Sequence, residues 1–259
     1  MDIIKALQEE LQIGRGQVEA AVKLIDEGNT IPFIARYRKE ATGSLNDEVL
    51  RNLDERLRYL RNLEDKKNQV IATIREQEKL TPELEKQIQE AKTLVAVEDL
   101  YRPYRPKRRT RATAAREKGL EPFAEWILAQ TAQIPAEEEA LSYVDPEKGV
   151  GTPKAAIEGA RDIIAEQISD EASYRTYIRR LTMEEGILQS EARDDKAQTV
   201  YEMYYHHEEP VARIAGHRVL AINRGEAEKV LTVKIAAPVE RILRYLEKQI
   251  ITADNPYTS

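Results

Sequence analysis

The feature that constrains this chain most is a stripe of aliphatic residues that recurs every three or four positions between residues 50 and 74. Its members are Leu50, Leu53, Leu57, Leu60, Leu63, Val70 and Ile74. This spacing places them on one side of an α-helix, and charged residues fill the other faces. A strict coiled coil is not expected, because Glu64 and Lys67 occupy positions that a heptad repeat would fill with apolar residues. The sequence therefore predicts one long helix that packs on its neighbours.

Shorter helices are predicted before this stripe. Apolar residues repeat at helical spacing over residues 3–11 and 18–25, and Gly28 is well placed to end the second of these helices. Thr30 and Pro32 predict the start of a third helix, which Gly43 would close. Such an arrangement is compatible with a helix-turn-helix. The residues expected to complete its small core are Ile31, Phe33, Ile34 and Tyr37.

Helical patterns also dominate the remainder of the chain. Ser44 and Asp47 predict a capping box for the long helix. Further helices are predicted to begin at Thr81-Pro82, after about Thr113, and at Thr152-Pro153. One strand is predicted over residues 231–235, where apolar and polar residues alternate, although no partner strand is obvious. The last residues, TADNPYTS, are interpreted as a chain end or loop.

The predicted fold class is therefore mainly α, with a helix-turn-helix-like N-terminal segment followed by a multi-helix scaffold with at most a minor strand. The predicted domains are residues 1–43 and 44–259, with a possible sub-boundary in the turn-rich connection near 145–152.

The strongest chemical feature is the run YRPYRPKRRTR at residues 101–111. Its cations are Arg102, Arg105, Lys107, Arg108, Arg109 and Arg111, and its aromatic residues are Tyr101 and Tyr104. Guanidinium groups suit phosphate oxygens and tyrosine rings can stack on bases, so the run is a candidate nucleic-acid site. Because proline disfavours helix in the preceding residue, we expect the Tyr-Arg-Pro repeats to be extended. The alternative is that the tyrosines pack on the scaffold while the cations pair with acids such as Glu98 and Asp99.

A second group of cations, Arg36, Arg38 and Lys39, falls on the predicted third helix. A recognition helix in a DNA groove would place such side chains near bases and phosphates. Solvated charge, or contact with another part of a larger molecule, is the alternative.

Other classes of protein are disfavoured. The net charge of −6 argues against binding polyanions with the whole surface, so a nucleic-acid site must be a local patch. The chain has no cysteine, no apolar stretch long enough for a membrane span and no secretory signal, so we expect a cytoplasmic protein that does not bind membranes. The adjacent residues His206 and His207 do not have the spacing of a metal site. Gly14-Arg15-Gly16 lacks the third glycine of a dinucleotide fingerprint. We expect no cofactor, no metal and no catalytic activity.

Several long runs resemble the bacterial Tex family of transcription accessory proteins. They are TIPFIARYRKEATGSLNDEVLRNLDERLRYL, KLTPELEKQI, VEDLYRPYRPKRRTRATAAREKGLEPFA, YVDPEKGV, GARDIIAE and HRVLAINRGE. The resemblance implies the mainly helical N-terminal part of a protein that binds nucleic acid, RNA or DNA, and that has RNA polymerase or other transcription machinery as possible partners. It also implies RNase H-like, helix-hairpin-helix and OB-fold RNA-binding domains that this chain does not contain. We therefore expect a truncated form, whose predicted strand lost its partner with the missing half. A scaffold that docks those domains or polymerase without binding nucleic acid is the alternative function.

Overall fold

The computed structural model describes residues 2–106 and 108–258. The chain forms two compact units, Met1–Tyr104 and Arg105–Ser259. This division lies far from the predicted one after Gly43, because the helices on both sides of Gly43 contribute to a single core.

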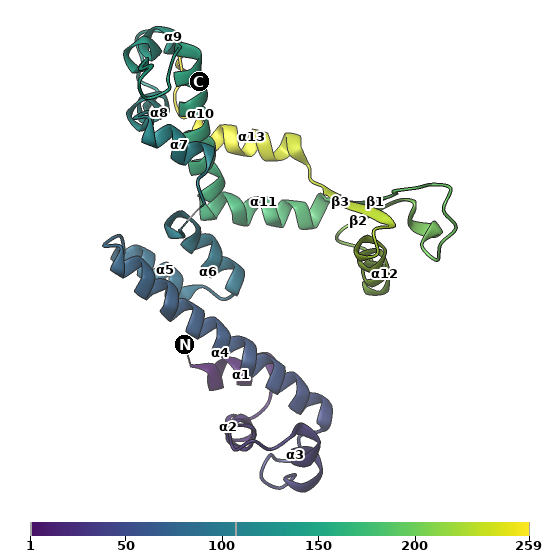
Figure 1. The fold of residues 1–259 in the computed structure, drawn as a ribbon. Helices are drawn as coiled ribbons and strands as arrows, with labels where there is room; N and C mark the ends of the chain where they lie inside the picture. The colour runs from purple at the N-terminus through teal and green to yellow at the C-terminus, as the bar shows by residue number, and fades with distance from the viewer. Residues whose placement is uncertain (1, 107, 259) are drawn as a thin grey trace. The chain divides into compact units, whose positions relative to one another are not determined.

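The first unit is entirely helical. It contains α1 (Ile3–Leu11), α2 (Arg15–Asp26), α3 (Ile31–Tyr37), α4 (Asp47–Glu76), α5 (Pro82–Glu90), α6 (Leu94–Tyr101) and the short 3₁₀ helix η1 (Arg102–Tyr104). Figure 1 shows α4 running the length of this unit, with the shorter helices along it. The predicted long helix is confirmed, and every member of its aliphatic stripe is buried. The predicted capping box is wrong, because Asn46 caps α4 by accepting a hydrogen bond of 2.8 Å from the backbone N–H of Val49.

Lys67, which interrupts the apolar stripe of α4, is a buried cation with a structural role. Only 3% of the residue is exposed. Its Nζ donates hydrogen bonds of 2.9 Å to Glu64 Oε1 and to the backbone carbonyl of Gln89. The lysine thereby satisfies a carbonyl in the last turn of α5 that has no partner within its own helix, and it joins the two helices.

The third helix differs from its prediction in both length and packing. It ends at Tyr37, and residues 38–44 form turns in which Gly43 has a φ of +61°. Gln17 holds these turns through hydrogen bonds from Nε2 to the carbonyls of Thr42 and Gly43. A side chain at Gly43 would be strained by the positive φ and would lie only 2.8 Å from Gln17 Nε2, which explains the glycine.

The predicted core of α3 is only partly correct. Ile34 is fully buried and Ile31 packs against the core, whereas 36% of Phe33 and 60% of Tyr37 are exposed. Ile31 and Ile34 are three residues apart and share the inner face. Phe33 and Tyr37, four residues apart, share a different face that meets solvent.

The second unit combines helices with a small sheet. It contains α7 (Arg111–Glu117), α8 (Glu121–Ala129), α9 (Ala136–Glu139), η2 (Ala140–Tyr143), α10 (Pro153–Asp170), α11 (Ala172–Glu185), β1 (Ile187–Ala192), η3 (Glu202–Tyr204), β2 (His206–Pro210), α12 (Gly216–Ala227), β3 (Leu231–Ala236) and α13 (Val239–Ile250). Its helical core lies between α7, α8, η2 and α10, and Phe123 stacks on Tyr143 there at 4.8 Å. The predicted sub-boundary near 145–152 falls inside this core, where Val150 is buried.

The predicted strand is confirmed as β3, but the expectation that its partner is absent is wrong. The sheet has the order β2-β1-β3, with both pairs antiparallel. In the central strand, Ser190 lies opposite Val233 on one side and His207 on the other. The helix α12 covers the sheet (Figure 1), and Ile222 and Leu231 are buried between them.

Two antiparallel helices connect the sheet to the helical core. The chain leaves the core along α11 and returns along α13, side by side in Figure 1. The Tyr177 and Tyr245 rings stack at 3.7 Å, and Arg241 at the start of α13 pairs with Glu185 at the end of α11.

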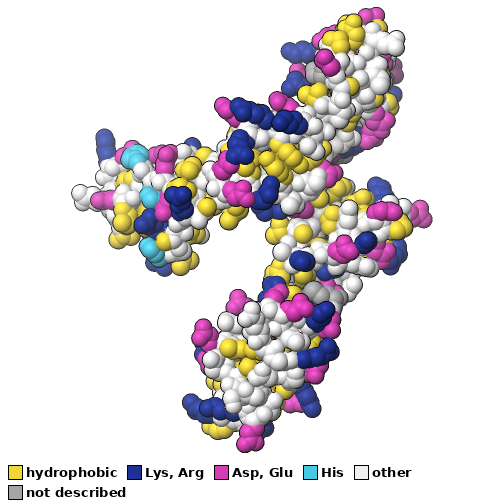
Figure 2. All heavy atoms as spheres, turned by 180° about the vertical axis from the view of Figure 1, so that it is seen from behind, with side chains coloured by type: hydrophobic (Ala, Val, Ile, Leu, Met, Phe, Trp, Pro, Cys, Tyr) yellow, Lys and Arg dark blue, Asp and Glu magenta, His cyan; other side chains and the backbone are white. Residues whose placement is uncertain are grey.

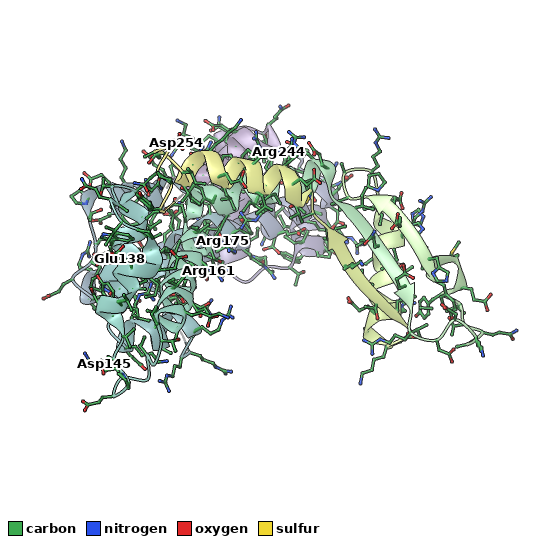
Figure 3. All side chains as sticks on the ribbon, turned by 90° about the horizontal axis from the view of Figure 1, so that it is seen from above. Glu138, Asp145, Arg161, Arg175, Arg244 and Asp254 are labelled. Atoms are coloured by element: carbon green, nitrogen blue, oxygen red, sulfur yellow. The ribbon has the colours of Figure 1, made fainter. Side chains whose placement is uncertain are left out.

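The end of the chain is a loop, as expected, and side-chain hydrogen bonds anchor it. Gln130, of which 6% is exposed, donates from Nε2 to the carbonyl of Ile250 at 2.6 Å. Its Oε1 accepts from the backbone N–H groups of Thr252 and Ala253, both at 3.0 Å. Asn255 completes the contact by donating to the carbonyl of Gln130 at 3.1 Å. Figure 3 shows Asp254, between these residues, next to the helical core beyond the end of α13.

We predict that Lys67→Ala lowers the free energy of unfolding by about 1–3 kcal/mol, because Glu64 and the Gln89 carbonyl lose a buried partner. Chemical denaturation monitored by circular dichroism measures this change. Lys86→Ala is the matched control, since Lys86 is exposed and pairs with Glu90 of its own helix. Equal effects of the two substitutions would contradict a structural role for Lys67.

We predict that Gln130→Ala releases residues 250–255 from the helical core. Hydrogen exchange should become faster at the amides of Thr252 and Ala253, because the substitution removes their acceptor. Gln133→Ala, at a nearby exposed position, should leave the exchange of both amides unchanged. Unchanged protection in the Gln130 variant would show that other contacts hold the chain end.

Candidate nucleic-acid interface

The basic run of residues 101–111 crosses the boundary between the two compact units. Tyr101 is the last residue of α6, η1 follows, and Arg111 is the first residue of α7. Lys107 lies outside the described residues. The prediction that both repeats are extended is wrong for the first, because Arg102 has an α-helical backbone (φ −53°, ψ −43°) despite the proline that follows it. Proline disfavours this conformation without forbidding it.

The two tyrosines of the run anchor it to the first unit. Both half-buried rings pack against the core that surrounds α4. The carbonyl of Tyr104 accepts a hydrogen bond of 3.0 Å from Gln77 Nε2, at the end of α4. Lys66 Nζ lies 5.8 Å from the centre of the Tyr101 ring. These contacts favour the packing alternative for both tyrosines.

Thr110 anchors the other end of the run to the second unit. Its Oγ1 caps α7 by accepting a hydrogen bond of 3.0 Å from the backbone N–H of Thr113, and it lies 2.9 Å from Glu166 Oε1. Arg116 donates to the other oxygen of Glu166 at 2.6 Å. This hydrogen bond raises the pKa of Arg116, and it holds α7 on α10.

All five arginines of the basic run are exposed. Arg109 pairs with Glu117 at 2.8 Å, and Arg111, with 88% of its side chain exposed, pairs with Asp162 at 3.5 Å. Arg108 has no carboxylate partner among the described residues. Exposed ion pairs of this kind are weak. The guanidinium groups are therefore accessible to a phosphate.

The second candidate group lies around the end of α3. Arg36 is on the helix, whereas Arg38 and Lys39 follow its last residue, so the predicted recognition helix carries only one of the three cations. None of the three has a carboxylate partner within the described part of the chain. They border a hollow of about 490 Å³, which is lined by residues 36–41. The sequence did not predict the exposure of Phe33 and Tyr37, because their spacing of four residues shows only that they share a face.

The remaining surface offers weaker candidates. Figure 2 shows basic and acidic side chains interspersed over the face in view. His206 and His207 lie in β2, where they contact Glu191 at 2.8 Å and Glu209 at 3.2 Å. Residues 2–106 and 108–258 contain no group of three or more potential metal ligands. They also contain no helix that is both long and apolar enough to span a membrane.

Family models match one segment in each compact unit. The model of the Tex-like protein N-terminal domain matches residues 1–75, and that of the Tex central region matches residues 131–254. The chain belongs to the Tex family. The basic run lies between the two matched segments of this Tex chain.

The relatives that this chain matches are much longer than the matched region. An uncharacterised protein of Bacillus subtilis, YdcI, is 48% identical over 95% of this chain and 34% of its own length. Protein tex of Bordetella pertussis is 45% identical over 90% of this chain and 30% of its own length. The human S1 RNA-binding domain-containing protein 1 is 32% identical over 90% of this chain and 24% of its own length. The Tex chain thus spans about a third of the bacterial relatives or less.

We predict that Thr110→Ala destabilises the second unit by about 1 kcal/mol, because α7 loses its capping oxygen. Thermal unfolding followed by the fluorescence of Trp126, which packs against the core of this unit, reports the change. Thr176→Ala is the control, since Thr176 is exposed on α11 and its hydroxyl donates a hydrogen bond to the carbonyl of Ala172 in the same helix. A stability equal to that of the control would show that the cap does not hold the end of the basic run.

Proposed function

We propose that this part of the Tex protein is a non-enzymatic module that contributes to nucleic-acid binding in a transcription accessory protein. The observation that carries the proposal is the exposed arginine cluster of the basic run, anchored at both ends by Tyr104 and Thr110. The cap at Thr110 limits the conformational freedom that the adjacent Arg109 and Arg111 lose when they bind a ligand. A relative from Neisseria gonorrhoeae is named transcriptional accessory protein Tex, and a human relative is named for an RNA-binding domain.

Contacts of this type act mainly on the phosphate backbone. Arginine on phosphate releases counterions and carries little sequence information, so binding should be salt-sensitive and tolerant of sequence. This mode fits an acidic protein, since the positive potential is local. We propose a cytoplasmic location, where a transcription accessory protein would meet RNA, DNA and RNA polymerase.

A second candidate function is docking of a protein partner, either further Tex domains or RNA polymerase. The observation that favours it is α13, none of whose residues is buried. Val239 and Leu243 are exposed four residues apart on this helix, so they lie on one face. Exposed apolar side chains arranged in this way are typical of interaction surfaces.

The test is fluorescence anisotropy of labelled single-stranded RNA and duplex DNA at several salt concentrations. We expect wild-type binding to weaken with salt, and Arg108→Glu/Arg109→Glu/Arg111→Glu to abolish most of it. If single-stranded RNA contacts all three arginines, their loss should reduce the slope of log K against log salt by about 2. Circular dichroism must show that the variant remains helical.

A control with the same change in net charge is Lys23→Glu/Lys79→Glu/Lys154→Glu, which alters exposed lysines outside the basic run. Equal losses in both triple variants would indicate a general effect of charge and contradict the proposed site. Absence of binding by wild type would favour the docking function.

A further inference from the structure

Two aromatic rings near the end of α3 are exposed to solvent instead of being buried in the core. Tyr37 is the most exposed aromatic residue in the described chain, at 60%. Its ring centre lies 5.2 Å from that of Phe33, with the rings tilted by 47°. The inner face of α3 is already occupied by Ile34, so the two rings contribute to a surface and not to the packing of the helix.

Cations surround this aromatic pair. The guanidinium carbon of Arg38 lies 5.3 Å from the centre of the Phe33 ring, which orients Arg38 beside the rings. Arg36, Tyr37, Arg38 and Lys39 line the hollow at the end of the helix, where Glu40 is the one acidic neighbour. We call Phe33, Arg36, Tyr37, Arg38 and Lys39 the α3 patch.

The chemistry of the α3 patch selects a particular kind of ligand. Cations without carboxylate partners attract an anion, and an exposed tyrosine ring adds an apolar plane. Single-stranded nucleic acid presents both complementary features, since its phosphates are negative and its unpaired bases expose their faces for stacking. A duplex offers the phosphates but keeps its base faces within the helix.

We propose that the α3 patch binds single-stranded nucleic acid by stacking an unpaired base on Tyr37, while Arg36, Arg38 and Lys39 contact the flanking phosphates. This inference rests on the proposed nucleic-acid-binding function, but it assigns a separate site and a preference for unpaired strands. The basic run supplies backbone contacts that single strands and duplexes share. The α3 patch supplies the contact that distinguishes them.

The test compares Tyr37→Ala and Tyr37→Phe in binding a single-stranded RNA that contains 2-aminopurine. Wild type should quench the 2-aminopurine fluorescence through stacking. Tyr37→Ala should lose the quenching and bind the RNA about 5- to 150-fold more weakly, the range for one stacked base. Tyr37→Phe should retain both properties. The affinity of Tyr37→Ala for duplex DNA should equal that of wild type, because no cation is removed.

Val95→Ala is the matched control, because it shortens an exposed apolar side chain of the same unit. A Tyr37→Ala variant that binds single-stranded RNA as tightly as wild type overturns the inference. So does an equal loss on RNA and duplex DNA, or a poly-glutamate ligand that binds with the same dependence on Tyr37.

The outcomes separate this inference from the function on which it rests. If the basic-run variant loses binding and Tyr37→Ala does not, the α3 patch is not a binding site and the proposed function stands. If wild type binds neither RNA nor DNA, both proposals are wrong.

Discussion

Burial of the aliphatic stripe of α4 is the constraint on which the first unit depends, together with the α3 patch and the tyrosines of the basic run that belong to this unit. The helix α3 packs on α4 through Ile34, which leaves Phe33 and Tyr37 facing solvent. At the other end, Gln77 follows α4 and donates a hydrogen bond to the carbonyl of Tyr104 in the basic run. A single helix thus positions the α3 patch and the two tyrosines of the basic run, which are more than 60 residues apart in sequence.

In the second unit, the sheet and the helical core are separate clusters of buried residues that must be joined. The pair α11 and α13 joins them, and the Tyr177 and Tyr245 stack holds this pair together. Gln130 then fastens the returning chain to the end of α8. Figure 3 shows Arg175 on α11 and Arg244 on α13, so this connecting pair also carries basic side chains.

The two candidate surfaces differ in what they could recognise. The basic run combines exposed arginines with tyrosines that are occupied in packing, so it is suited to phosphate and not to bases. In the α3 patch, by contrast, the aromatic residue Tyr37 is exposed beside the cations and is free to stack on a base. Composition alone does not separate these cases, because both segments contain arginine and tyrosine. The difference arises from which face of each helix is buried.

Sequence by itself determined the features that depend on neighbours within one helical turn. The stripe of α4, the start of α5 with its cap Thr81, and the start of α10 with its cap Thr152 all follow from local spacing and capping chemistry. The alternation that predicted β3 is equally local. The Tex resemblance was also visible in sequence, because long runs of specific residues carry it.

Only the tertiary structure decided the features that depend on a distant partner. Strand β1 was missed because a short strand gains its hydrogen bonds from β2 and β3, which lie elsewhere in the chain. The sequence did not explain why Lys67 interrupts the apolar stripe, because its acceptor, the Gln89 carbonyl, lies on another helix. It also did not predict how the chain end is held, because Gln130 lies more than 100 residues away. Periodicity tells which residues share a face. Which face meets solvent is decided by the elements that pack against it.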